Sequence, residues 1–301
     1  METLPFNNSG RMLYAAIGDV HGDLPSLTAA VDAIRATAAE SGRDATIVVL
    51  GDAIDRGPDS AGCAAFIMRL ARGEDAARPG TSLLFVRGDH DVALSYDEAS
   101  GRFSSAVEPA DWAERLNGLP PDDDERRIAK DWIAFVGESP AAVLLRGESE
   151  GVLLSHGAVP HSDLLPRLET LSDAASPECG RDFTWCRVAS SGRKIPNRSS
   201  LFCDVGLLDV ASFLDWLAAR AGGDGFEIGH FVHGHEHTPP GCVATALPGG
   251  RTAWTVGTFR DDGDGILDAM RPAALLLNPD APPAPECGAI APRPLYPEVP
   301  Q

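Results

Sequence analysis

The stretch LYAAIGDVHG at residues 13–22 decides how this chain folds. Residues 13–17 are apolar and predict a short buried strand, which Gly18 ends. Asp19 and His21 follow two positions apart, so in extended backbone their side chains face the same way. A carboxylate and an imidazole that converge on one point suit Mn²⁺, iron or Zn²⁺. Alone, the pair also fits a turn aspartate beside a surface histidine, so the neighbouring segments decide its meaning.

The N-terminal third of the chain alternates between strand-like and helix-like patterns. Helices are predicted at 24–39, with Pro25 in the first turn where proline is tolerated, and at 60–71. Further apolar strands are predicted at 45–50 and 82–86. Strands joined by helices at this spacing predict right-handed crossovers and a parallel sheet. In such a sheet the functional loops gather beyond the carboxyl ends of the strands.

The later part of the chain has strand-like segments with few helices between them. Strands are predicted at 143–145, 152–154, 231–232, 252–256 and 273–277, and a helix at 210–221. This pattern predicts a second, more antiparallel sheet.

Residues 97–138 interrupt the strand pattern and are interpreted as a helical insertion. Trp112 and Trp132 within it either shape a substrate entrance or fill a small core, since large aromatic side chains serve both roles. We expect a single domain over residues 1–278. Residues 279–301 are rich in proline and are predicted to form an extended tail.

The composition argues against several classes of protein. The 301 residues carry a net charge of -19, which would repel a nucleic acid or an anionic membrane. No apolar run approaches the length that spans a bilayer, and the N-terminus lacks the apolar core of a signal peptide. The six cysteines form no CxxC pair, so reduced thiols fit best. We expect a cytoplasmic protein without nucleic-acid or membrane partners, and no pattern indicates its oligomeric state.

Four more segments with charged residues or histidines follow predicted strands. They are GDAIDRG at 51–57, RGDHD at 87–91, SHG at 155–157 and HGHEH at 233–237. Taken singly, each has a simple alternative, such as an Asp–Arg salt bridge in the first of them or a solvated polar loop in the last. Their order and their shared place at strand ends carry the functional meaning.

Together, GDVHG, GDAIDRG, GDHD, SHG and GHEH resemble the metallophosphoesterase superfamily, the calcineurin-like enzymes. GDVHG and the DRG of GDAIDRG are similar to its phosphoprotein phosphatase branch, which includes Ser/Thr phosphatases and diadenosine tetraphosphatases. The resemblance covers residues 18–237, but neither the insertion nor the tail. It implies an α/β fold, a β-sandwich of two mixed sheets flanked by helices (αββα), with two metals at the sheet edge.

The resemblance also implies a set of metal ligands, all of them carboxylates or imidazoles. They are Asp19, His21, Asp52, Asp89, His156, His235 and His237. Asp19 and His21 would bind the first metal, and Asp52 would bridge both. Asp89, His156 and His235 would complete the second metal site. His237 is either a further ligand of the first metal, as in the GHxH of the wider superfamily, or a plain loop histidine. The expected cofactors are two divalent ions, manganese with iron and zinc as alternatives.

The remaining candidates concern catalysis. By the resemblance, His90 would be the general acid or an electrostatic stabiliser, and Asp55 would orient it. Arg56 would hold phosphate oxygens. A second arginine is expected for the same task, and the segment WCR at 185–187 looks like the matching one, which makes Arg187 the candidate.

The chain departs from the family pattern at one ligand. The family has asparagine where this chain has Asp89, which puts the charge of the second metal site in question. Three further histidines, His161, His230 and His233, match no motif and are interpreted as structural or solvated.

The resemblance implies a metal-dependent phosphatase, a phosphomonoesterase that hydrolyses by direct attack of a metal-bridging hydroxide. Its partner would be a phosphorylated substrate, either a phosphoprotein or a small phosphoester. One alternative is a dinucleoside polyphosphate hydrolase or phosphodiesterase. Another is a catalytically degenerate scaffold that keeps the fold for binding.

Overall fold

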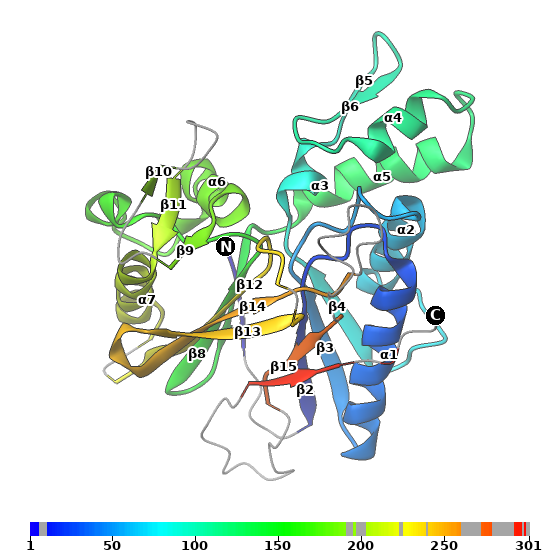
Figure 1. Cartoon of the computed structure of the whole chain (residues 1–301). Coiled ribbons are helices and arrows are strands. Elements are labelled where there is room, and N and C mark those ends of the chain that lie inside the picture. Colours follow the sequence, from blue (N-terminus) through cyan, green and yellow to red (C-terminus); the bar gives the residue numbers. More distant parts are fainter. Residues whose placement is uncertain are drawn as a thin grey trace.

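Two β-sheets pack face to face, and helices cover their outer faces (Figure 1). The computed structural model describes residues 1–5, 11–190, 195–196, 203–222, 225–238, 240–259, 272–278, 292–296 and 298. This arrangement is the expected αββα sandwich of mixed sheets. Most of the proline-rich tail lies outside the described residues.

The first sheet has five strands. In spatial order they are β16 (Arg293–Leu295), β15 (Ala274–Leu276), β2 (Met12–Ile17), β3 (Asp44–Val49) and β4 (Thr81–Phe85). The strands β2, β3 and β4 are parallel and are connected through α1 (Leu24–Glu40) and α2 (Ser60–Ala71), as the sequence predicts. The antiparallel strand β16 shows that part of the tail belongs to this sheet.

Aspartate caps start both of these helices. Asp23 Oδ1 accepts a hydrogen bond from Ser26 N at 3.0 Å, and Asp59 Oδ1 accepts one from Gly62 N at 2.7 Å. Each cap satisfies a backbone N–H that the first helical turn leaves without a partner. Because the caps follow the segments GDVHG and GDAIDRG, they fix where these two loops end.

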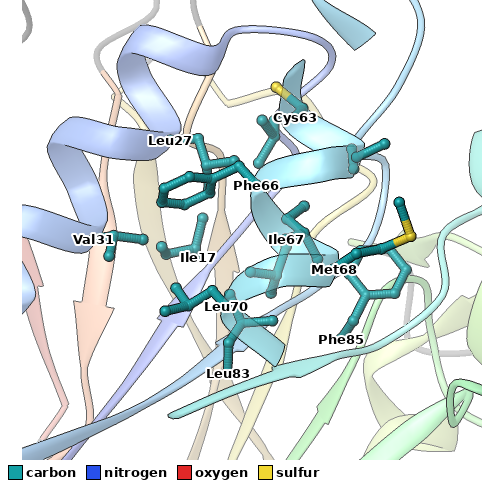
Figure 2. Packing of buried hydrophobic residues seen from close by; sticks show 14 of the residues in the cluster. Ile17, Leu27, Val31, Cys63, Phe66, Ile67, Met68, Leu70, Leu83 and Phe85 are labelled. Carbon is teal, nitrogen blue, oxygen red and sulfur yellow. The ribbon is translucent and has the colours of Figure 1, made fainter. Parts of the chain in front are cut away.

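The side chains of β2 alternate between two cores. Leu13, Ala15 and Ile17 belong to the core beneath α1 and α2, whereas Tyr14 and Ala16 belong to the core between the sheets. Figure 2 shows the first core, where Ile17 lies among apolar side chains of α1, α2 and β4. Each fully buried large aliphatic or aromatic side chain contributes about 1.5–3 kcal/mol relative to an exposed one. Burial on both faces explains why this strand is a continuous apolar run.

The second sheet has six strands. In spatial order they are β1 (Glu2–Pro5), β7 (Ala142–Arg146), β8 (Glu150–Ser155), β12 (Glu227–His233), β14 (Arg251–Val256) and β13 (Cys242–Leu247). The prediction of a more antiparallel sheet is wrong, because β1·β7, β8·β12 and β12·β14 are parallel pairs. Only β7·β8 and β13·β14 are antiparallel among the described pairings of this sheet.

A helical crossover explains the parallel pair of β8 and β12. Between β8 and β12 the chain forms α6 (Pro177–Trp185) and α7 (Leu207–Ala221), which cover the outer face of the sheet and return the chain in the same direction. Shorter elements complete this part of the fold. They are the 3₁₀ helices at Ser162–Arg167, Asp173–Ala175 and Pro248–Gly250, and the strands β9 (Val188–Ala189), β10 (Ile195–Pro196) and β11 (Cys203–Gly206).

The insertion is only partly helical. It follows α3 (Asp89–Ala93) and contains the hairpin β5 (Ser95–Asp97) and β6 (Arg102–Ser104) before α4 (Asp111–Asn117) and α5 (Asp124–Glu138). Within the described chain, none of the helices combines the length and the apolarity needed to cross a membrane.

Both tryptophans of the insertion fill a core. Trp132 is fully buried, with its ring centroid 4.9 Å from that of Phe85 and 5.4 Å from that of Phe135. Trp112 is also buried, and its Nε1–H donates to Glu125 Oε1 at 2.9 Å. The alternative in which these side chains line an entrance is therefore wrong.

Candidate active site

The five motif segments meet at one end of the sandwich, where β2, β3, β4, β8 and β12 end. Backbone hydrogen bonds join the segments directly: His21 N donates to Asp52 O at 2.7 Å, and Gly234 N donates to His156 O at 2.9 Å. His235 N donates to Asp19 Oδ1 at 2.9 Å, which connects the first segment to the last. The site is thus assembled from both sheets.

Backbone strain is concentrated in these loops. Among the described residues, the non-glycine residues with positive φ are His21 (44°), Asp52 (48°), Asp55 (65°), Arg56 (65°) and His235 (64°). All of them are predicted site residues. The left-handed conformation is unfavourable for residues with a Cβ and persists where the surrounding structure enforces it.

Two motif glycines allow close packing around the carboxylates. A Cβ at Gly88 would collide with Asp52 Oδ1, and a Cβ at Gly234 would collide with Asp19 Oδ1. The glycines of GDHD and GHEH are therefore required by the positions of the neighbouring aspartates.

The Nε2 atom of His21 faces two carboxylates and makes no hydrogen bond in the described structure. Its Nδ1–H donates to the carbonyl of Ile54 at 3.1 Å, and no hydrogen-bond partner reaches its buried Nε2 within the described structure. Nε2 lies 4.0 Å from Asp19 Oδ2 and 3.6 Å from Asp52 Oδ2. Burial, with a further effect of nearby His90, lowers the pKa of His21 well below its ordinary value, so the ring is neutral. A neutral imidazole oriented by a backbone carbonyl is the usual state of a metal ligand.

His237 lies with Asp19 and His21. The ligand atoms of these three residues all fall within 4.8 Å of one another. The Phe259 ring packs edge-on against both imidazoles, with centroid distances of 4.7 Å to His21 and 5.1 Å to His237. The structure thus places His237 beside Asp19 and His21, and its role as a metal ligand stays a prediction.

A second group combines Asp52, Asp89, His156 and His235, whose ligand atoms also lie within 4.8 Å of one another. The Nδ1–H of His156 donates to the carbonyl of Leu50 at 2.8 Å. Its Nε2 lies 3.1 Å from His235 Nδ1 and 3.2 Å from Asp89 Oδ1. Ring nitrogens and carboxylate oxygens therefore converge, with no thiolate among them, which suits manganese, iron or zinc.

Asp52 lies between the two groups. Its Oδ1 accepts from His90 N at 3.0 Å, and its Oδ2 faces His156 Nε2 at 3.4 Å as well as His21 Nε2. Burial, together with the nearby Asp89, raises the pKa of Asp52 well above its ordinary value. Crowding buried carboxylates in this way is unfavourable without positive charge. The converging carboxylate oxygens and ring nitrogens fit divalent cations, and so does His21 Nε2, which has no hydrogen-bond partner among the described residues.

Asp91 has a role that the sequence reasoning missed. Its Oδ2 accepts from Asp52 N at 2.7 Å and from Gly88 N at 3.0 Å, and its Oδ1 accepts from Ala53 N at 3.1 Å. Burial raises its pKa to about 6. Asp91 therefore ties the GDAIDRG loop to the GDHD loop. The only signal in the sequence was a second acidic residue in GDHD.

His90 and Asp55 form a buried pair. His90 Nδ1 lies 2.8 Å from Asp55 Oδ2, as expected from the resemblance, which leaves His90 Nε2 for another partner. Asp55 Oδ1 accepts from Trp112 N at 3.0 Å, and Asp55 N donates to Ser60 Oγ at 3.0 Å. The insertion thus contacts the site through the backbone N–H of Trp112.

The structure fixes the position of His90, and its catalytic role stays a prediction.

The two candidate arginines are exposed beside the site. Arg187 Nε donates to His235 Nε2 at 3.2 Å. Burial lowers the pKa of His237, and the positive charges of Arg56 and Arg187 add to this effect against the opposing charge of Asp19. Both guanidinium groups are therefore near the imidazole of His237, and their phosphate-binding role stays a prediction.

The other histidines lie outside the ligand groups. His161 Nδ1 accepts from Asp163 N at 3.1 Å and so caps a 3₁₀ helix. His233 Nδ1 lies 2.8 Å from Glu236 Oε2, while His230 lies within β12.

Comparison with known proteins agrees with this geometry. The family model of the calcineurin-like phosphoesterases matches residues 12–239. A comparison with curated protein sequences gives no match.

Several solved structures are similar to this chain at low sequence identity. One is a protein serine/threonine phosphatase from Saccharomyces cerevisiae with similarity to human phosphatase PP5 (TM-score 0.59, 16% identity, 92% of this chain and 76% of that one). Another is a cold-active protein tyrosine phosphatase (TM-score 0.52, 16% identity, with 92% and 76% covered). A third is a hypothetical protein from Pyrococcus horikoshii OT3 (TM-score 0.50, 12% identity, with 96% and 89% covered). These likenesses show a shared fold, and the family match spans most of the sequence. The chain therefore belongs to the calcineurin-like phosphoesterase family.

Proposed function

We propose that this protein is a two-metal-dependent phosphomonoesterase. The observation that carries the proposal is the position of Asp52 Oδ2, which lies 3.6 Å from His21 Nε2 and 3.4 Å from His156 Nε2. One carboxylate oxygen thus faces a nitrogen of each ligand group, which is where a ligand that two metals would share is expected. A site for one metal would not need this shared oxygen.

The residues divide between the two metals by their grouping. Asp19, His21 and His237 would hold the first metal, whereas Asp89, His156 and His235 would hold the second. When bound, two divalent cations supply a water of lowered pKa and positive charge for the phosphate oxygens.

The chain's own residues supply the rest of the chemistry. His90, held by Asp55 at 2.8 Å, would give a proton from Nε2 to the leaving oxygen. Arg56 and Arg187 would bind the non-reacting phosphate oxygens, where their charge stabilises the transition state. No described cysteine belongs to the ligand groups, so no thiol nucleophile is part of this proposal.

Phosphoproteins are the first substrates to test. Two structures with the same fold are named protein phosphatases, one for serine/threonine and one for tyrosine. A phosphodiester or a dinucleoside polyphosphate is the second candidate. Asp89 favours the phosphodiester of these two, because an extra negative charge near the phosphate disfavours a monoester dianion more than a diester monoanion.

The test is hydrolysis of p-nitrophenyl phosphate and of bis-p-nitrophenyl phosphate after treatment with a chelator. Turnover should vanish in the metal-free protein and return with Mn²⁺, in proportion to bound metal measured by mass spectrometry. Phosphopeptides and a dinucleoside tetraphosphate, assayed with Mn²⁺, then separate the substrate classes. Full activity in a sample verified to be metal-free would contradict the two-metal proposal. Binding of metal without turnover of any substrate would favour a scaffold.

A further inference from the structure

The loop that carries His235 and His237 has a third polar side chain, Glu236, which belongs to neither ligand group. Glu236 Oε1 accepts a hydrogen bond from Val188 N at 2.6 Å. This N–H belongs to the residue directly after Arg187. A carboxylate from the GHEH loop therefore holds the backbone of the segment that carries a candidate phosphate-binding arginine.

The Glu236 carboxylate is itself fixed in place. Its side chain is only 24% exposed, and Oε2 lies 2.8 Å from His233 Nδ1, which makes its hydrogen bond to the carbonyl of Gly234 at 3.0 Å. The His233 ring stacks on Phe231 with a centroid distance of 5.0 Å, and its Nε2 lies 3.2 Å from Thr255 Oγ1. Glu236 is thus connected to the end of β12 and to β14, which are rigid parts of the second sheet.

The backbone around Arg187 makes contacts in three directions, and Val188 N makes the contact to the loop that carries His235, Glu236 and His237. Arg187 O accepts from Val205 N at 2.7 Å, and Cys186 O accepts from Ala158 N at 2.7 Å. These bonds connect the segment to β11 and to the SHG loop. Glu236 adds the contact that sets the segment relative to His235 and His237.

Fewer contacts fix the side chain of Arg187 than fix the backbone of its segment. Arg187 Nε donates to His235 Nε2, which requires a lone pair on that nitrogen. A neutral imidazole has one lone pair, and a cation held at His235 Nδ1 would use it, so Nε2 would carry the proton. Arg187 would then lose this acceptor while the contact from Val188 to Glu236 stays intact.

We infer that Glu236 is a positioning residue for Arg187: it fixes the backbone from which the guanidinium reaches the phosphate. The inference rests on the proposed function. A charge-assisted hydrogen bond is about twice as strong as a neutral one, and a small displacement of a binding group lowers affinity steeply. Without the carboxylate, phosphate affinity should fall although both metal sites remain complete.

The first experiment measures the dissociation constant of inorganic phosphate for the Mn²⁺-loaded protein by calorimetry. Glu236→Ala should weaken binding about tenfold and raise KM for p-nitrophenyl phosphate more than it lowers kcat, because a misplaced arginine loses binding in the ground state too. Glu236→Gln keeps an acceptor for Val188 N and should stay within about threefold of the wild type. Glu227→Ala, at the exposed start of the strand β12 that precedes the Glu236 loop, is the matched control and should change nothing.

A double-mutant cycle identifies the residue through which Glu236 acts. In an Arg187→Ala background, Glu236→Ala should weaken phosphate binding by less than about twofold more, since residues that act through each other are not additive. Multiplied effects of the two substitutions would overturn the inference. So would loss of bound manganese in Glu236→Ala, which would mean that the carboxylate supports the metal ligands instead.

Hydrogen exchange separates this inference from the proposed function. Exchange of the peptide around Val188 should accelerate in Glu236→Ala but not in Glu236→Gln or Glu227→Ala. Unchanged exchange would overturn the inference even in an active enzyme. Accelerated exchange in a protein that binds no phosphate would instead refute the proposed function. Should Glu236→Ala not fold, Glu236→Asp shortens the side chain by one methylene group and replaces it in both experiments.

Discussion

Asp89 adds a negative charge where the family pattern has a neutral amide. Its Oδ1 lies 3.2 Å from His156 Nε2 and 3.5 Å from His235 Nδ1, so the charge sits inside the second ligand group. An ionised aspartate strengthens a metal bond but donates no hydrogen bond outward. At about 4 Å, its repulsion of a phosphate is roughly 1 kcal/mol in water and about 4 kcal/mol at an effective dielectric of 20.

Replacing Asp89 by asparagine should therefore have two opposite effects. Asp89→Asn is expected to weaken retention of the second metal and, once metal is saturating, to raise kcat/KM for phosphomonoesters. A metal titration followed by steady-state kinetics measures both. A tenfold or greater drop at saturating metal would show that Asp89 has a catalytic role that asparagine cannot perform.

His90 should act through its proton. His90→Ala is expected to lower kcat by about 10²–10⁴-fold on an alkyl phosphate, the usual contribution of a positioned acid. The loss should be much smaller on p-nitrophenyl phosphate, whose leaving group needs no proton. Asp55→Asn, which disturbs the 2.8 Å contact to His90 Nδ1, is the companion variant and should show the same dependence on the leaving group. An equal loss on both substrates would indicate an electrostatic or structural role.

The residues brought together at the site were largely predictable, but their supports were not. The resemblance of the segments to the family implied the same grouping of Asp and His residues and the contact of His90 with Asp55, which the structure places together. Asp91 and Glu236 accept hydrogen bonds from backbone N–H groups of other segments, and the backbone N–H of Trp112 donates to the Asp55 carboxylate. Such contacts depend on how loops pack, which no local pattern encodes.

At the scale of elements, local patterns predicted the strands and helices of the first sheet, since buried parallel strands and capped helices have distinct signatures. The second sheet was predicted less well. Strand β12 is parallel to β8 because α6 and α7 lie between the two in the chain and pack on the outer face of the sheet, whereas its parallel pairing with β14 comes from β13, which lies between β12 and β14 in the chain and is antiparallel to β14. The sequence pattern showed α7 but neither α6 nor the strands β1 and β13, so the parallel pairings were missed.

The insertion should matter for stability more than for substrate choice. Trp132 of α5 is fully buried against Phe85 of β4, so Trp132→Ala should destabilise the protein by about 3–5 kcal/mol, the usual cost of truncating a buried aromatic residue. Urea unfolding measures the change. Leu208→Ala, at a side chain that is 43% exposed, is the control and should stay within about 0.5 kcal/mol of the wild type. A change of less than about 1 kcal/mol at Trp132 would contradict this account of the core.

At the scale of the whole molecule, the second ligand group connects the two sheets. Asp52 and Asp89 follow β3 and β4 of the first sheet, whereas His156 and His235 follow β8 and β12 of the second. A cation bound by all four would therefore link the two halves of the sandwich. Since the unfolded chain has no such site, binding must stabilise the folded state.

Manganese should raise the free energy of unfolding by about 2.7 kcal/mol at a concentration one hundred times its dissociation constant. Thermal unfolding of metal-free protein, with and without Mn²⁺, tests this expectation. Asp52→Asn weakens both metal sites and should reduce the shift in Tm, whereas Glu227→Ala should leave it unchanged. No shift at saturating metal would mean that the four residues do not act as one site.

Five site residues have left-handed backbone, so substitutions that would stabilise the fold at these positions would also remove side chains that the site uses. At His21, Asp52, Asp55, Arg56 and His235, glycine would relieve a conformational cost of about 1–2 kcal/mol per residue, yet it would remove the side chain that the site uses. A library screened for heat resistance alone should therefore accumulate glycine at these positions and lose activity. Adding a requirement for turnover should remove the same variants, so a thermostable form of this protein has to be sought away from the loops that follow its strands.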